Sequence, residues 1–246
     1  MKSRGGAAGL LPPGKGPATP PPLFTNRPDL ADKYVMFAWP PESWPALLVG
    51  LMLLTYWLRV MQMVRITKKK AGHHANLIPE EKLGQLTRII WGPVIVLWIF
   101  VPLIAAFGIG NQLLPLRPML NLTALQWPAV AIAAVAYGLT WVCWIRMGKS
   151  WRMGIDPNDK TELVFTGPYS YVRHPIYGLS QLLMLMTVVI VPSPFMFVLA
   201  VLHLLFMQWE VRREEIYLCN LHGQGYIEYQ RHVGRFMPKS LRAYRP

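Results

Sequence analysis

Charged residues are scarce in this chain of 246 residues. Asp, Glu, Lys and Arg make up 15% of it, whereas they make up about 25% of a typical soluble domain. Apolar residues make up 53% of the chain, and many of them occur in long runs. These runs exclude a soluble fold of alternating strands and helices. Much of the chain therefore does not face water.

Cysteines and recognisable nucleotide or metal motifs are also few. The two cysteines, Cys143 and Cys219, belong to no CxxC pair, so neither a disulfide framework nor a structural metal is indicated. The histidine pair at 73–74 lacks further ligands at useful spacing and reads as a solvated loop. Residues 108–110, Gly-Ile-Gly, are followed by no third glycine, which excludes a dinucleotide fingerprint. We expect no metal.

Proline and glycine are concentrated in residues 1–28, MKSRGGAAGLLPPGKGPATPPPLFTNRP. This composition predicts a flexible, partly polyproline segment, because it has too little apolar surface to order itself. No apolar core follows the first basic residues, so we expect no secretory signal. With a short transition, the predicted flexible N-terminal segment comprises residues 1–43.

Three apolar runs are each long enough to cross a bilayer, which takes about 20 helical residues. They are residues 44–64, 88–109 and 125–147, so residues 44–147 are predicted to form three transmembrane helices.

A further apolar block, residues 176–209, contains Pro192-Ser193-Pro194 in its middle. The block is too long for one span and just long enough for two. It therefore predicts a tight helical hairpin whose second arm continues to about residue 221. The predicted fold is all-α, a multi-pass transmembrane helical bundle of about five spans.

Basic residues are distributed unevenly between the two sides of such a bundle. Residues 59–90, 146–177 and 205–246 fall on one side and carry 19 of the 25 Lys and Arg. The positive-inside bias makes this side cytoplasmic. The net charge of +13 then reflects topology and would favour anionic membrane lipids. No soluble basic stripe with stacking aromatics is present, so we expect no nucleic-acid partner.

Two segments on the cytoplasmic side are unlike the rest of the chain. The first, residues 163–178, reads LVFTGPYSYVRHPIYG and concentrates hydrogen-bond donors and aromatic faces just before a membrane helix. Arg173 suits a carboxylate or phosphate, and His174 can donate or accept a proton near neutral pH. An interfacial anchor of Tyr and Arg is an equally simple interpretation of this segment.

The second segment, residues 208–238, carries three glutamates at the end of a membrane helix. Glu210 and Glu214 share one helical stripe with His203, and Glu215 lies on the neighbouring face. Ionisable groups near membrane depth usually face a partner or a wet cavity. Surface pairing with the adjacent arginines at 212–213 is the alternative, and it would contribute little.

The order of these motifs resembles a known family. The chain resembles the C-terminal signature of the isoprenylcysteine carboxyl methyltransferase and phospholipid methyltransferase family. The matching elements, in chain order, are L-V-x-T-G-P-Y-x-x-V-R-H-P-x-Y-G, an apolar hairpin, E-E-x-x-L, a glycine, and Y-x-x-Y before a proline. The resemblance covers residues 148–240, and it identifies residues 148–246 as a methyltransferase-like catalytic region that includes the hairpin. His222 stands where the family usually has an aromatic residue before Gly223.

The resemblance implies an integral-membrane methyltransferase that uses S-adenosyl-L-methionine in a C-terminal cytoplasmic segment. The membrane would be a bacterial inner membrane or one of the endoplasmic-reticulum type. It implies catalytic roles for Arg173, His174 and Glu215. The implied cofactor-binding residues are Gly167, Tyr169, His174, Pro175, Tyr177, Glu214, Glu215 and Tyr226, and the implied substrate residues are Trp151, Arg152, Glu210 and Tyr229.

Two other functions remain open at this stage. Membrane sterol reductases have a similar layout, with Cys219 at a comparable place, but they differ next to the Arg-His pair and at Glu214-Glu215. A transporter or scaffold is less consistent with a chain that shows no internal repeat. The methyl acceptor is also open: a prenylated cysteine carboxylate, an ethanolamine headgroup, a small thiol, or a quinone-like or sterol-like lipid.

Overall fold

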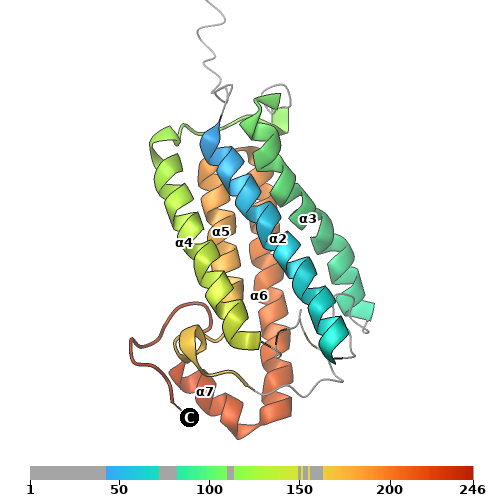
Figure 1. Cartoon of the computed structure of the whole chain (residues 1–246), viewed down its shortest axis with the longest axis vertical. Helices are drawn as coiled ribbons and strands as arrows, with labels where there is room; N and C mark the ends of the chain where they lie inside the picture. The colour runs from blue at the N-terminus through green and yellow to red at the C-terminus, as the bar shows by residue number, and fades with distance from the viewer. Residues whose placement is uncertain are drawn as a thin grey trace, which may run out of the picture. The chain divides into compact units, whose positions relative to one another are not determined.

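The computed structural model describes residues 43–71, 82–109, 114–148, 151, 155 and 163–245. The longer helices are α2 (Trp44–Ala71), α3 (Lys82–Ala106), α4 (Thr123–Met147), α5 (Pro175–Ile190), α6 (Pro194–His222) and α7 (Gln224–His232), and two short 3-10 turns are η2 (Leu114–Leu116) and η4 (Gly167–Ser170) (Figure 1). The described residues contain no strand, only one isolated parallel bridge between Val172 and Gly234. The predicted all-α class is confirmed.

Four of these helices, α2, α3, α4 and α6, are long and apolar enough to cross a membrane. The fifth apolar helix, α5, has 16 residues and therefore extends only about 24 Å at 1.5 Å per residue. Helix α6 has 29 residues and extends about 44 Å, more than the bilayer core of about 30 Å. The chain is thus a multi-pass helical membrane bundle, in which α6 continues past one end of its short partner α5.

The hairpin predicted at Pro192-Ser193-Pro194 is confirmed. Helix α5 ends at Ile190 and α6 begins at Pro194. Ser193 caps α6, because its hydroxyl oxygen accepts a hydrogen bond from the backbone N–H of Met196 at 3.1 Å. A serine cap followed by a proline in the first helical turn is a strong signal for a helix start.

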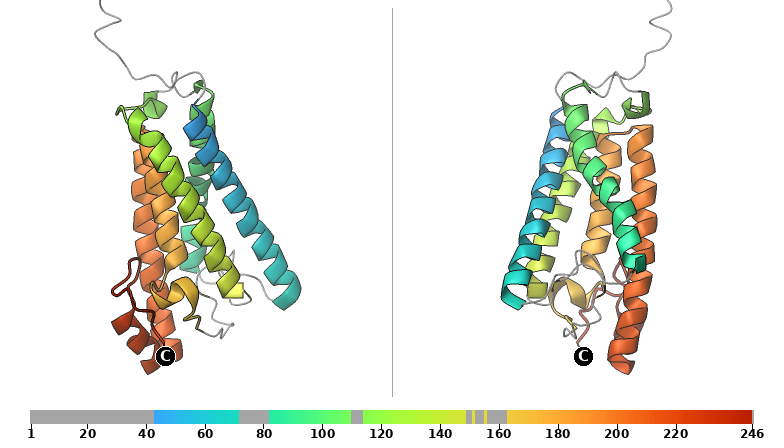
Figure 2. Two further views of the ribbon diagram at one scale, coloured as in Figure 1. Left: turned by 60° about the vertical axis from the view of Figure 1, so that its left-hand side comes forward. Right: turned by 90° about the vertical axis from the view of Figure 1, so that its right-hand side faces the viewer.

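The bundle closes on itself through neighbouring helices. Helix α4 packs along α5, α2 along α3, and α6 against both α5 and α3 (Figure 2). The α4–α5 contact is close because α4 buries the small residues Ala129, Ala133 and Ala136, and small residues let helix backbones approach each other in a membrane.

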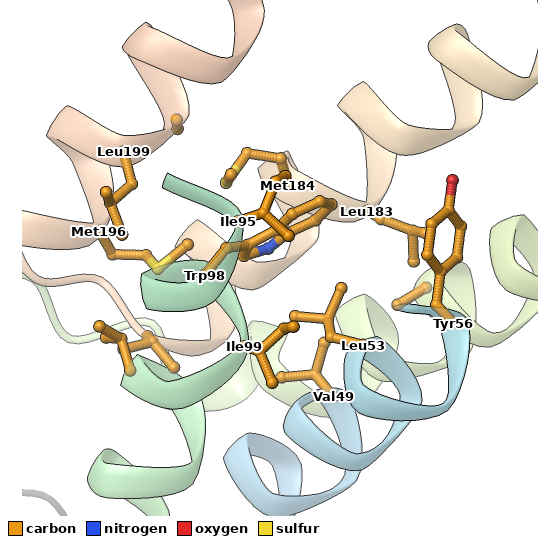
Figure 3. Packing of buried hydrophobic residues seen from close by; sticks show 14 of the residues in the cluster. Val49, Leu53, Tyr56, Ile95, Trp98, Ile99, Leu183, Met184, Met196 and Leu199 are labelled. Carbon is orange, nitrogen blue, oxygen red and sulfur yellow. The ribbon is translucent and has the colours of Figure 1, made fainter. Parts of the chain in front are cut away.

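The core and the outer surface of the bundle are both apolar. Val49, Leu53, Ile99, Trp98 and Met184 lie inside and contact one another across α2, α3 and α5 (Figure 3). Large apolar side chains also point outward, among them Leu58, Ile89, Val135, Ile145 and Leu205, each more than half exposed. Such an extensive apolar exterior suits contact with lipid and not with water.

Candidate active site

A large cavity opens between the helices at the end where α6 continues into α7. Its empty volume is about 1240 Å³ including the part that opens to solvent, and ligand pockets usually measure about 300–1,000 Å³. Its lining comes from all five apolar helices, from α7, from Trp151 and from residues 163–174. The lining residues are Tyr56, Trp57, Val60, Arg88, Trp91, Trp144, Met147, Trp151, Leu163, Val164, Tyr169, Arg173, His174, Pro175, Ile176, Tyr177, Ser180, Phe206, Met207, Glu210, Glu214, Leu218, Tyr226 and Tyr229.

The part of the cavity between the membrane helices is aromatic. The Tyr56 and Trp144 rings lie 4.9 Å apart between centroids, and the stacked Trp91 and Phe206 rings lie 4.8 Å apart. Trp57 meets Trp91 edge-on at 5.5 Å. The charged groups in this region are Glu210 and Arg88, whose nearest atoms are 3.9 Å apart. Glu210 also pairs with Arg213 at 3.3 Å. This half of the cavity suits an apolar ligand.

The other end of the cavity contains buried polar atoms that lack hydrogen-bond partners. They are the hydroxyls of Tyr169 and Tyr226 and Oε2 of Glu214. Nε2 of His174 instead lies 3.4 Å from Oε1 of Glu215. Burial raises the pKa of Tyr169 and of Tyr226 well above the ordinary value, so both phenols keep their protons and can donate hydrogen bonds. Buried polar groups in proteins are nearly always paired. Three unpaired atoms at one cavity end therefore indicate a polar ligand.

Glu215 lies next to the polar end of the cavity but outside its lining, and two arginines bind its carboxylate. Arg173 donates to its Oε1 from Nε at 3.0 Å and from Nη2 at 2.7 Å. Arg235 donates to Oε2 from Nε at 3.1 Å. The hydrogen bond to Glu215 raises the pKa of Arg235 above its ordinary value. Both carboxylate oxygens of Glu215 are thus occupied, and its side chain does not line the cavity.

The C-terminal segment fixes the Arg173-His174 motif from the outside. The backbone N–H groups of Arg173 and His174 donate to the carbonyls of Gly234 and Arg235, at 2.8 and 3.0 Å. The Arg173 guanidinium also donates to the carbonyls of Gln230 (3.2 Å) and Val233. Backbone and side-chain bonds together hold residues 172–174 against residues 230–235.

The structure brings together most residues that the sequence singled out. Ten of them line the cavity: Trp151, Tyr169, Arg173, His174, Pro175, Tyr177, Glu210, Glu214, Tyr226 and Tyr229. Gly167 and Glu215 do not. Gly167 has a positive φ of 63°, a conformation that favours glycine, so its position is explained by the turn at η4. Arg152 lies outside the described residues.

Sequence reasoning missed three contributions to this site. Arg235 pairs with Glu215 from a position that no element of the family signature marks. Arg88 and the aromatic residues of α2 and α3 line the cavity from the part of the chain in which we recognised no motif. A signal was present for Arg88, because an ionisable residue within a membrane-spanning run usually faces the bundle interior or a cavity.

Gly234 is predicted to be indispensable for this arrangement. A Cβ atom at this position would overlap the carbonyl oxygen of Met237. Gly234→Ala should therefore displace residues 234–237 and loosen Arg235, lowering the free energy of unfolding by about 1–3 kcal/mol. Thermal unfolding in detergent measures the effect. Gly225→Ala is the control, because nothing lies within 4 Å of a Cβ added there; equal melting temperatures for both variants would contradict the prediction.

Comparison with known proteins supports one of the possible families. Residues 129–220 match the model of the isoprenylcysteine carboxyl methyltransferase (ICMT) family. The match begins within α4 and includes the Arg173-His174 motif, the hairpin and the Glu214-Glu215 pair. No curated protein matches the chain. The predicted resemblance to the ICMT family is confirmed, and together with the apolar helices it supports a membrane methyltransferase. The match gives no support to the sterol-reductase alternative.

Proposed function

We propose that this protein transfers a methyl group from S-adenosylmethionine to a lipophilic or small membrane-permeant acceptor. The observation that carries the proposal is the two-part cavity, which is polar and unpaired at one end and aromatic at the other. A methyltransferase of this kind must bind a polar cofactor and an apolar acceptor beside each other. The ICMT match independently supports methyl transfer.

The residues at the polar end fit S-adenosylmethionine. Its methionine end carries a carboxylate and an amino group, and its ribose carries hydroxyls. Glu214 can accept from the amino group or a ribose hydroxyl, while Tyr169, Tyr226 and His174 can donate to oxygens or ring nitrogens. Tyr177 stacks near His174, with ring centroids 5.8 Å apart, and its face suits a sulfonium cation. When bound, S-adenosylmethionine would supply an electrophilic methyl group.

Arg173 has a different role in this proposal from His174. Its guanidinium already donates to Glu215 and to the Gln230 and Val233 carbonyls. We therefore assign a positioning role to Arg173 and Glu215, and the contacts of the cofactor carboxylate to the hydroxyls of Tyr169 and Tyr226 beside His174. In this assignment Glu215 is no proton acceptor, because two arginines hold its oxygens.

The protein would contribute to catalysis mainly by alignment in a water-poor cavity. The aromatic side chains of α2, α3, α4 and α6 would hold the apolar part of the acceptor and exclude water. Holding the acceptor close to the methyl group in this way can account for much of the rate enhancement of a displacement reaction. A carboxylate or thiolate acceptor reaches the cavity ionised and needs no base. An amine acceptor needs one, and His174 and Glu214 are the lining groups that can take its proton. The basic loops support a cytoplasmic position for the polar end.

The proposal is tested by ligand binding to the purified full chain in lipid nanodiscs. Isothermal titration with S-adenosylmethionine should give saturable binding, and radiolabelled S-adenosylmethionine should then methylate one member of an acceptor panel. The panel contains S-farnesylcysteine, phosphatidylethanolamine and a long-chain alkyl thiol. The methyl ester of S-farnesylcysteine is the matched control, because its carboxylate is blocked. Absence of S-adenosylmethionine binding by protein whose helical circular dichroism is intact would refute the proposal.

A further inference from the structure

The loop that follows α7 carries the two most exposed large apolar side chains among the described residues. Met237 is 80% exposed and Leu241 is 90% exposed. Residues 237–245 form the C-terminal loop, of which residues 237–243 are all exposed. Single exposed apolar side chains are common on proteins, but two of them on one exposed loop indicate a partner that covers them.

The C-terminal loop is hydrogen-bonded to the rest of the site at both of its ends. Just before it, the carbonyls of residues 234–235 accept hydrogen bonds from the backbone N–H groups of residues 173–174, at 2.8 and 3.0 Å. Near its other end, the backbone N–H of Tyr244 donates to the carbonyl of Ser170 at 3.0 Å. The two exposed apolar side chains therefore belong to a loop that is held in place, and not to a frayed chain end.

The C-terminal loop begins at the level where α5 enters the helical bundle. A Cβ atom added to Gly178, in the first turn of α5, would lie 3.3 Å from the carbonyl oxygen of Phe236, the residue directly before the loop. Figures 1 and 2 show the chain after α7 rising beside the bundle to the level of the last turns of α4. Because α4 is long and apolar enough to cross the membrane, the end of α4 marks the membrane boundary. The loop thus lies at the surface of the bilayer.

The charge of this part of the chain has one sign. Residues 229–246 contain five Lys and Arg and no Asp or Glu. The ammonium of Lys239 donates to two carbonyls in the last turn of α7, at 2.9 and 3.3 Å, whereas Arg242 and Arg245 are exposed on the loop. Apolar side chains accompanied by cations are typical of segments that lie in the interface of a membrane with anionic lipids.

We propose that the C-terminal loop is a membrane-surface site for anionic phospholipids. Met237 and Leu241 insert between the lipids of the adjacent leaflet. Arg242 and Arg245 bind the lipid phosphates. The site lies outside the residues that match the ICMT family, and it does not depend on the reaction that takes place in the cavity. It does place a lipid contact directly beside the backbone bonds that hold the Arg173-His174 motif.

The test places a fluorescent label on the loop of the full chain in nanodiscs. Nitrobenzoxadiazole is attached at Ala243→Cys in a Cys219→Ser background, in which the other cysteine, Cys143, is buried. Lipids that carry a nitroxide next to the head group quench the label only where it touches the membrane. In discs that contain phosphatidylglycerol, quenching should be much stronger than for the same label at Arg231→Cys, on the exposed side of α7. In discs of phosphatidylcholine alone, the quenching at Ala243→Cys should fall.

Two variants separate the charged contact from the apolar one. Arg242→Gln should lower the ratio of membrane-bound to free loop about 5-fold, the contribution of one basic side chain near an anionic surface. Arg242→Lys keeps the charge and should restore the wild-type ratio. Leu241→Ser should lower the ratio about 10-fold, the effect of losing one inserted apolar side chain. Because both side chains are exposed, each variant should unfold at the wild-type temperature.

Equal quenching at the two labelled positions would overturn the proposal. Quenching that is the same with and without phosphatidylglycerol, or the same in Arg242→Gln, would overturn the phosphate contact. A label that leaves water only in discs that hold two copies of the chain would assign the loop to a contact between copies instead. None of these measurements uses S-adenosylmethionine, so their outcome is distinct from success or failure of the proposed function.

Discussion

Glu215→Ala is expected to abolish methyl transfer and to lower the free energy of unfolding by about 3–5 kcal/mol, the usual cost of removing one partner from a buried ion pair. The carboxylate is 5% exposed and is shared by Arg173 and Arg235. Without it, the Arg173 side chain, which is 8% exposed, becomes a buried cation with no counter-charge. The hydrogen bonds that hold residues 230–235 against the Arg173-His174 motif would weaken, and His174 would no longer be fixed in the cavity lining.

The measurement combines thermal unfolding in detergent with methyl transfer in nanodiscs. For a chain of this size, a loss of that magnitude corresponds to a fall in melting temperature of on the order of 10 °C. Glu228→Gln is the matched control, since Glu228 pairs with Arg231 and His232 on the exposed side of α7. Exposed pairs contribute about 1 kcal/mol at most. A Glu215→Ala protein as stable as this control would show that the ion pairs do not hold the site together.

The transmembrane helices could be predicted because their cause is local. A run of about 20 apolar residues needs no partner elsewhere in the chain to specify a span, and the Pro-Ser-Pro turn marks the hairpin in the same way. The boundaries were less accurate. Helix α2 continues to Ala71 and α3 already begins at Lys82, beyond the apolar runs, because Lys and Arg have a high helix propensity although they are not apolar.

The residues that pair within the site could be predicted only where a sequence motif marked both members of the pair. Arg173-His174 and Glu214-Glu215 belong to one recognised signature, and the structure brings them together. Which glutamate faces the cavity depends on the helical phase of α6 and on the return of the C-terminal segment. Arg235 is one of several basic residues near the C-terminus, and nothing local distinguishes it. Its pairing with Glu215 arises from backbone bonds to residues 173 and 174.

The adjacent Glu214 should give the opposite result from Glu215. Glu214→Gln is expected to weaken S-adenosylmethionine binding about 10- to 100-fold, the effect of losing one hydrogen bond to a charged group. The melting temperature should stay close to wild type. The nearest polar partner of Glu214 Oε2 is Nδ1 of His174 at 3.9 Å, beyond hydrogen-bond distance, so the substitution removes no hydrogen bond from that atom.

The two variants should differ in opposite ways in cofactor affinity and in stability, which distinguishes a residue that binds the cofactor from one that stabilises the site. Glu214→Gln should reduce cofactor affinity in isothermal titration while its unfolding curve overlays that of Glu228→Gln. Glu215→Ala should shift the unfolding curve itself. A Glu214→Gln protein with wild-type affinity for S-adenosylmethionine would remove the unpaired carboxylate from the proposed cofactor site. It would leave the hydroxyls of Tyr169 and Tyr226 as the groups that need a ligand, and these are donors suited to an anionic or oxygen-rich one.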